Sequence, residues 1–260
     1  KASSSSDLGA TWTAPSSLSA SGQAAYSQEI GVDSTGRAIV IWYRFDGSGF
    51  IIQSSWSDDG GVNWSTAQDM SDASFGSTSP LVEFVTADSA IAAWSSVEGS
   101  DATVHARWSN DGGVTWQAPI DVVAAPGDVY GLRFATDSSG NMMLVWYRND
   151  GGPINFVEYS LSVDGGLTWS AASVLSPASL SVNYISISVD SRDNATLMWS
   201  GYDGVNYLVQ SRTVSSPSDP TLPNTGMSDE SVFTATTVGL LAIGLGAVVL
   251  VCLLYTSPSP

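Results

Sequence analysis

The sequence is poor in the residue types that carry most protein chemistry. Its 260 residues include one cysteine, Cys252, and one histidine, His105. A single cysteine cannot form an internal disulfide, and a single histidine excludes zinc sites built from several histidines. Ser-His-Asp catalysis has only His105 to draw on, so we interpret His105 as a hydrogen-bonded strand residue beside Arg107. No metal site and no cofactor is predicted.

Basic residues are also scarce. Eight Lys and Arg stand against 25 Asp and Glu, which gives a formal net charge of −17. Such a charge repels nucleic acid and keeps an exposed protein soluble, so no nucleic-acid partner is expected. Before residue 230, no window of helical length carries apolar residues at the spacing of an amphipathic helix. The larger part of the chain is therefore not helical.

What the sequence has instead is a repeat. The pattern Ser-x-Asp-x-Gly-x-Thr/Asn-Trp, here called a box, occurs four times. The boxes consist of Ser5, Asp7, Gly9, Thr11 and Trp12; of Ser57, Asp59, Gly61, Asn63 and Trp64; of Ser109, Asp111, Gly113, Thr115 and Trp116; and of Ser162, Asp164, Gly166, Thr168 and Trp169. The box tryptophans recur at intervals of 52, 52 and 53 residues. A constant period of this length indicates one supersecondary unit used repeatedly.

A second set of tryptophans has the same period. Trp42, Trp94, Trp146 and Trp199 each end a short apolar run. The first full period contains four segments typical of short strands, at 26–30, 38–43, 50–56 and 65–69. The second segment is apolar on both faces, as expected for a strand that is covered on both sides. Four strands in a period of about fifty residues predict an all-β fold, a β-propeller of four-stranded blades.

The box resembles the Asp box, or BNR repeat, of sialidase-like β-propellers, and the resemblance covers residues 1–214. It implies that each box forms the turn between the third and fourth strands of a blade. We interpret the box residues as structural rather than as catalytic acids or calcium ligands, because an active site is assembled once whereas repeats build a scaffold. Sialidases of the family carry an Arg-Ile-Pro motif and three converging arginines. This chain has no Arg-Ile-Pro and its seven arginines are dispersed, so the resemblance carries the fold without the activity.

The end of the propeller opposite the boxes is the predicted ligand face. Strand directions alternate, so the loops between second and third strands lie at this end, where the family has its active site. Each loop has an acid four residues after its tryptophan, at 46, 98, 150 and 203. This pattern indicates either a partial ring of carboxylates that binds a cation or ordinary Asp-Gly hairpin turns. Two Tyr-Arg pairs offer a stacking face and a fork for a carboxylate, with packing at the core edge as the alternative. The candidate ligand residues are Tyr43, Arg44, Asp46, Tyr147, Arg148, Asp150, Tyr202 and Asp203.

The C-terminal part has a different composition. A Pro/Ser-rich linker at 215–221 precedes an LPxTG-type motif, and an uncharged run at 232–254 has 23 residues, enough to cross a bilayer as one transmembrane helix. The motif is Leu222, Pro223, Asn224, Thr225 and Gly226. The arrangement resembles the sortase sorting signal of Gram-positive surface proteins, which implies cleavage between Thr225 and Gly226 and coupling of Thr225 to peptidoglycan. Residues 252–260 resemble the translation of a sequencing adapter rather than a basic tail, and we interpret them as an artefact that includes Cys252.

The repeat is incomplete at both ends. The first box has no strands before it, the chain begins with Lys1, and the last repeat has no box. We expect further blades upstream; the alternative is a strand at 12–17 that closes a four-bladed ring with the last repeat.

The predicted function is that of an exported surface propeller, covalently attached to the cell wall, that binds a glycan or a protein. Its covalent partners are sortase and peptidoglycan, and it contacts the membrane only through 232–254 before sorting. One alternative is an exo-sialidase or related glycosidase with its catalytic residues in upstream blades. The other is a structural display stalk.

Overall fold

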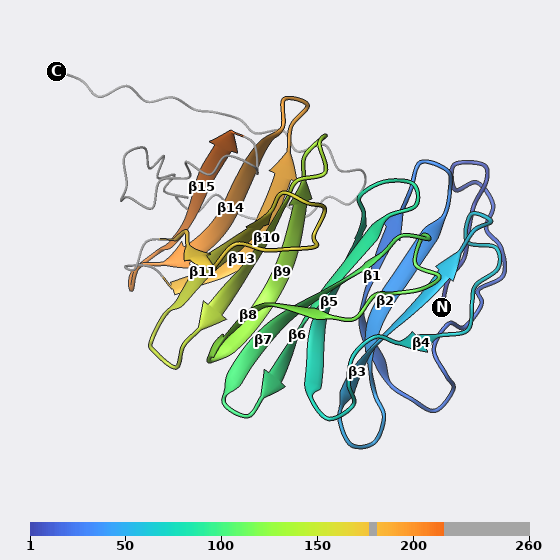
Figure 1. Ribbon diagram of the computed structural model, residues 1–260, viewed down its shortest axis with the longest axis horizontal. Helices are drawn as coiled ribbons and strands as arrows, with labels where there is room; N and C mark the ends of the chain where they lie inside the picture. The colour runs from blue at the N-terminus through green and yellow to red at the C-terminus, as the bar shows by residue number, and fades with distance from the viewer. Residues whose placement is uncertain (177–180, 216–260) are drawn as a thin grey trace.

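The computed structural model describes residues 1–176 and 181–215. The predicted sorting motif and the apolar run at 232–254 lie outside the described residues, as does the linker beyond residue 215. Within the described part the chain is all-β, which confirms the predicted fold class (Figure 1). No helix among these residues is long and apolar enough to cross a membrane.

Consecutive strands form four antiparallel sheets, here called blades 1 to 4. Blade 1 contains β1 (Ala25–Val32), β2 (Ala38–Phe45), β3 (Phe50–Ser57) and β4 (Gln68–Asp69), and blade 2 contains β5 (Gly76–Phe84), β6 (Ala90–Glu98), β7 (Asp101–Ser109) and β8 (Ile120–Pro126). Blade 3 contains β9 (Asp128–Thr136), β10 (Met142–Asn149), β11 (Asn155–Ser162) and β12 (Ser173–Val174), and blade 4 contains β13 (Ser181–Val189), β14 (Asn194–Tyr202) and β15 (Tyr207–Ser215). The blades stack in chain order (Figure 1).

Two details differ from the sequence-based expectation. The fourth strand of blade 1 was expected at 65–69. Ser65 N does bond to Trp56 O at 2.8 Å, but regular pairing with β3 is limited to Gln68–Asp69. Among the described residues, the segment 12–17 does not pair with the last repeat, so the four-bladed ring is not formed. Ser16 instead pairs with Ala2, and this N-terminal segment lies beside blade 1, far from blade 4 (Figure 1).

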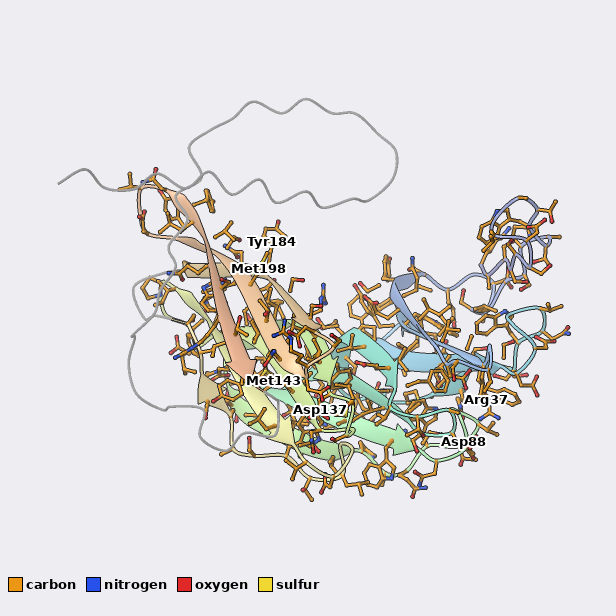
Figure 2. The ribbon with its side chains drawn as sticks, turned by 90° about the horizontal axis from the view of Figure 1, so that it is seen from above. Arg37, Asp88, Asp137, Met143, Tyr184 and Met198 are labelled. Atoms are coloured by element: carbon orange, nitrogen blue, oxygen red, sulfur yellow. The ribbon has the colours of Figure 1, made fainter. Side chains whose placement is uncertain are left out.

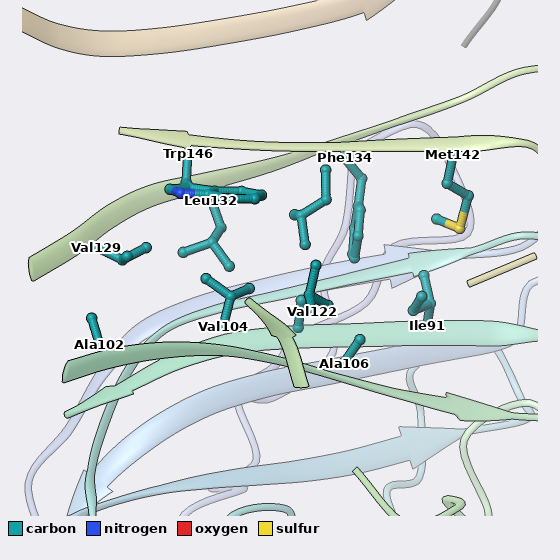
Figure 3. Close-up of a cluster of buried hydrophobic side chains, with 12 residues drawn as sticks. Ile91, Ala102, Val104, Ala106, Val122, Val129, Leu132, Phe134, Met142 and Trp146 are labelled. Carbon is teal, nitrogen blue, oxygen red and sulfur yellow. The ribbon is translucent and has the colours of Figure 1, made fainter. Parts of the chain in front are cut away.

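The apolar cores lie between the blades. Figure 3 shows the core between blades 2 and 3, where Met142 and Trp146 of β10 face Ile91 and Val104 of blade 2. The other face of β10 contributes Met143 to the core between blades 3 and 4. Because successive side chains of a strand point to opposite faces, a middle strand between two neighbours needs apolar residues at every position. This explains the continuous apolar runs that end in tryptophan.

The first strand of each blade carries the same bulge. Its residue with positive φ is Ser27 (47°), Ser79 (54°), Gly131 (62°) or Tyr184 (52°), again at intervals of 52, 52 and 53 residues. The pairing of the first with the second strand shifts register at this point in every blade. A side chain in this region of φ costs about 1–2 kcal/mol, and bulges of this kind bend a strand and redirect its side chains. The bend lies toward the end of the blades opposite the boxes.

Candidate functional site

The boxes of blades 1 to 3 lie between the third and fourth strands. In blade 1, the Asp59 carboxylate accepts the backbone N–H of Asn63 at 2.8 Å and its side-chain amide at 2.7 Å. The Ser57 hydroxyl accepts the N–H of Gly61 at 2.9 Å and donates to Asp59 at 2.9 Å. These bonds, led by the backbone bond from Asn63, lower the pKa of Asp59 to about 2. All of these bonds lie within the box, so the Asp59 carboxylate stabilises its own turn.

The other boxes repeat this geometry, with the aspartate accepting from the Thr hydroxyl at 2.6 Å in each. Their glycines also join the blades. A Cβ on Gly113 would lie 2.6 Å from Cδ1 of Ile39 in blade 1, and one on Gly166 would lie 2.2 Å from Cδ1 of Ile91 in blade 2. Both glycines have positive φ, 86° and 90°. Glycine is therefore required here for conformation and for close approach to the preceding blade.

The tyrosines of the predicted ligand face pack against aromatic neighbours. Tyr43 stacks on Tyr26 with ring centroids 5.4 Å apart, and Tyr147 stacks on Tyr130 at 5.5 Å. In blade 4, the Tyr202 ring lies 5.0 Å from that of Tyr207. These pairs give the end opposite the boxes an aromatic surface, of which Tyr26 is 46% and Tyr130 42% exposed.

The acids of this face hold hairpin turns. Asp46 accepts the N–H groups of Ser48 and Gly49 at 2.8 and 2.9 Å, and these bonds, led by that from Gly49, lower its pKa to about 2. Asp150 accepts from Gly152 at 3.0 Å and Asp203 from Val205 at 2.8 Å. The turn interpretation of these Asp-Gly pairs thus accounts for their contacts.

The two arginines of this face differ in their partners. Arg148 donates from Nε and Nη2 to the Glu158 carboxylate at 2.9 and 3.0 Å, so its fork is filled by a residue of the same blade. Arg44 has Asp69 at 3.7 Å, beyond hydrogen-bonding distance. The pairing of these residues with a ligand stays a prediction.

Beside the second-strand tryptophan of blades 1 to 3 lies a mostly polar cluster that sequence reasoning did not assemble. It is formed by the residue two positions after the tryptophan, the residue opposite the tryptophan on the third strand, and the next partner on the fourth strand. The clusters are Trp42, Arg44, Gln53 and Asp69 in blade 1; Trp94, Ser96, His105 and Asp121 in blade 2; and Trp146, Arg148, Glu158 and Val174 in blade 3. Alignment of the repeats shows that these positions are equivalent, at intervals of 52 or 53 residues, but the contacts among them follow only from the register of the sheet.

In blade 2 the cluster is a chain of hydrogen bonds. His105 Nδ1 lies 2.9 Å from Asp121 Oδ1, and His105 Nε2 lies 2.7 Å from Ser96 Oγ and 3.5 Å from a carboxylate oxygen of Glu98. The imidazole lies 5.4 Å from the Trp94 ring. His105 is therefore hydrogen-bonded within the sheet, as predicted, but with partners that the sequence did not reveal.

Ser96, His105 and Asp121 are hydrogen-bonded in the sequence Ser–His–Asp, as in a catalytic triad. Acyl transfer, however, also needs free N–H donors beside the nucleophile. Ser96 lies inside β6, paired with β5 on one side and β7 on the other, and only 2% of it is exposed. Its own N–H lies within this paired sheet and is not presented to a substrate. The arrangement favours a fixed binding surface over a nucleophile.

This cluster opens into a cavity of about 150 Å³ that is lined by blade 2 and by the segment 71–75, which joins blade 1 to blade 2. The lining residues are Ser71, Asp72, Phe75, Ser77, Trp94, Ser96, Glu98, His105, Pro119 and Asp121. They combine aromatic faces with carboxylates and hydroxyls. Among the described residues, no group of three or more His, Cys, Asp or Glu is arranged to hold a metal ion. The cavity suits a polar, neutral or cationic ligand group.

Comparison with known proteins places the fold. No protein-family model and no curated protein sequence matches the chain. Among solved structures, an α-L-arabinofuranosidase from Fusarium graminearum matches with 14% identity and a TM-score of 0.58, and an α-L-arabinanase from Penicillium chrysogenum with 12% and 0.59; each match covers 74% of this chain and 63% of the other. A Hadza microbial sialidase matches with 16% identity and a TM-score of 0.53, over 71% of this chain and 43% of the other.

The described residues thus have the fold of the sialidase-like β-propellers. The chain spans less than two thirds of the length of these structures. At such low identity, the likeness extends to the fold alone.

Proposed function

We propose that this propeller binds a glycan through the cavity beside His105 in blade 2. The observation that carries the proposal is the cavity lining, in which Phe75, 36% exposed, stands beside Glu98, Asp121 and hydroxyl groups. Sugars are recognised by aromatic faces that cover their C–H groups and by carboxylates that accept bonds from their hydroxyls. The cavity is smaller than the roughly 300–1,000 Å³ of typical ligand pockets, so it receives one terminal group of a larger ligand.

The comparisons support carbohydrate as the ligand class. The arabinofuranosidase is complexed with an iminosugar inhibitor and the arabinanase with arabinobiose. The test is calorimetric titration of the full chain with the neutral sugar arabinobiose, after a screen on a glycan array; the anionic 3′-sialyllactose should bind more weakly, because carboxylates line the cavity. Phe75→Ala should weaken binding at least tenfold, whereas Phe45→Ala, an exposed aromatic outside the cavity lining, should leave it unchanged. Equal loss in both variants, or no glycan bound at all, contradicts the proposal.

A second candidate is glycosidase activity, favoured by the fold of the solved structures above and by the two acids, Glu98 and Asp121, on either side of His105. Glycosidases work with a pair of carboxyl groups. Hydrolysis of 4-nitrophenyl arabinofuranoside and of a fluorogenic sialoside by the full chain tests this candidate. Turnover that is lost in Glu98→Gln would support it, and binding without turnover would favour the first proposal.

We further propose that the chain is exported and attached to a Gram-positive cell wall. The support is the motif Leu222, Pro223, Asn224, Thr225 and Gly226 ahead of the uncharged run at 232–254. Incubation with a sortase and triglycine should yield a product that ends in Thr225 linked to the peptide, identified by mass spectrometry. Thr225→Ala should abolish this product; cleavage elsewhere would contradict the proposal.

A further inference from the structure

The polar cluster of blade 1 contains donors without acceptors. Trp42 Nε1, Arg44 Nε and Arg44 Nη1 are buried and have no hydrogen-bond partner among the described residues. Trp42 is 3% exposed, and the Arg44 side chain is 12% exposed. Both side chains project from the same face of β2, two residues apart. Buried N–H groups in native proteins nearly always have an acceptor, and none of the described residues accepts from these three.

Blade 3 shows what the acceptor is when the same donors are satisfied. Trp146 Nε1 donates to Glu158 at 2.9 Å, and Arg148 donates to the same carboxylate from Nε at 2.9 Å and from Nη2 at 3.0 Å. The remaining nitrogen, Nη1, donates to the carbonyl of Pro126 at 2.8 Å. In blade 3 the Trp-Arg pair is therefore built around a carboxylate.

Blade 1 keeps this Trp-Arg pair but has Gln53 in the place of Glu158. The Gln53 amide turns to Asp69, to which Nε2 donates at 2.7 Å, and its Oε1 has no partner in the part of the chain that the structure describes. The Asp69 side chain is 54% exposed and lies 3.7 Å from Arg44 Nη2. The Asp69 carboxylate therefore offsets the charge of Arg44 without accepting a bond from Arg44 Nε, Arg44 Nη1 or Trp42 Nε1.

We infer that Trp42 and Arg44 bind a small carboxylate anion, which takes the position that the Glu158 carboxylate has in blade 3. The site is separate from the cavity beside His105 in blade 2, because none of its residues lines that cavity. An anion reaches it from the Arg44 side, where the cluster meets solvent. Charge-assisted bonds from the guanidinium and a bond from the indole N–H hold it.

The test uses formate as the probe on the full 260-residue chain. Formate titration at constant ionic strength, with chloride as the replaced salt, should raise the melting temperature with a saturable midpoint. In Gln53→Glu the chain supplies the carboxylate itself, so the formate midpoint should rise at least tenfold and the melting temperature without formate should increase. Arg44→Lys, which keeps the charge but loses Nε, should also weaken the response.

Two further variants make the result decisive. Glu158→Gln should create a second formate response in blade 3. Gln210→Glu changes the equivalent residue of blade 4, where Gly201 replaces the arginine, and should leave the wild-type response intact. The inference is overturned if formate has no effect on the wild-type chain, which would mean that water alone meets these donors, or if Gln53→Glu responds to formate like the wild type.

Discussion

The middle strands of blades 2 and 4 occupy the same place in the repeat but differ in burial. In β6, every residue from Ala90 to Ser96 is buried. In β14, Leu197 and Trp199 are 2% and 4% exposed, whereas Met198 between them is 46% exposed (Figure 2). Blade 2 has a neighbour on both faces, and blade 4 has a neighbour among the described residues on one. The number of neighbouring blades, rather than the strand itself, determines how much of a middle strand is buried.

This comparison places most of the stability in the interfaces between blades, as expected for a repeat protein. The largest expected effect is that of Leu144→Ala, which removes a side chain of β10 that is 0% exposed. It should lower the free energy of unfolding by about 3 kcal/mol. Met198→Ala, on the open face of blade 4, should change it by less than about 0.5 kcal/mol. Denaturant unfolding of the two variants measures the difference; similar effects would place the stability within blades.

Gly166→Ala should have the next largest effect, because it combines positive φ with a clash against Ile91. We expect a loss of about 2–3 kcal/mol. Gly60→Ala is the matched control, since Gly60 also has positive φ, 75°, but has open space around its Cβ position. Its loss should be about 1 kcal/mol. If thermal unfolding shows equal losses, the box glycine serves the turn alone and does not join the blades.

Asp59→Asn should have a smaller effect, which depends on pH. The folded pKa of Asp59, about 2, is below its ordinary value near 3.8, so the ionised carboxylate stabilises the folded chain above about pH 4. This contribution decreases as the pH falls from about 4 to 2. The difference in unfolding free energy between wild type and Asp59→Asn should therefore shrink over this range. A difference that is constant between pH 7 and pH 2.5 would show that the charge plays no part.

The ion pair between Arg37 of blade 1 and Asp88 of blade 2 should contribute least. Figure 2 shows the two residues side by side, with Arg37 Nη1 3.0 Å from Asp88 Oδ1. The Asp88 side chain is 74% exposed, so solvent screens the attraction. Arg37→Ala should lower the unfolding free energy by no more than about 1 kcal/mol, and the loss should decrease in 1 M salt. A larger loss of unfolding free energy would show that an exposed ion pair at the edge of a blade interface also contributes substantially to stability.

The sequence was sufficient for much of the fold. The period of the tryptophans predicted the blades, and the apolar runs predicted their middle strands, because both depend on local alternation and burial. The bulges at Ser27, Ser79 and Tyr184 could not be predicted, since these residue types rarely adopt positive φ and nothing nearby in the sequence requires it.

The candidate site was predicted less well. Strand direction correctly placed the loops between second and third strands at the end opposite the boxes. Tyr43 and Tyr147 at this end form aromatic pairs, and their contact with a ligand stays a prediction. The cluster of Ser96, His105 and Asp121 was missed because its members come from three strands and make contact only through the register of the sheet. The difference between Arg44 and Arg148 was also not visible, because it depends on which residue lies across the sheet.

The order of pairing in the sheets has a consequence for how the chain acquires its structure. Within residues 1–176 and 181–215, each strand of a sheet pairs with the strand next to it in the chain, and no sheet includes a strand from a distant segment. Contacts of short sequence separation form quickly, and domains form from the N-terminus onward as a chain is synthesised. We therefore expect vectorial folding, in which each completed blade serves as the template against which the next one condenses.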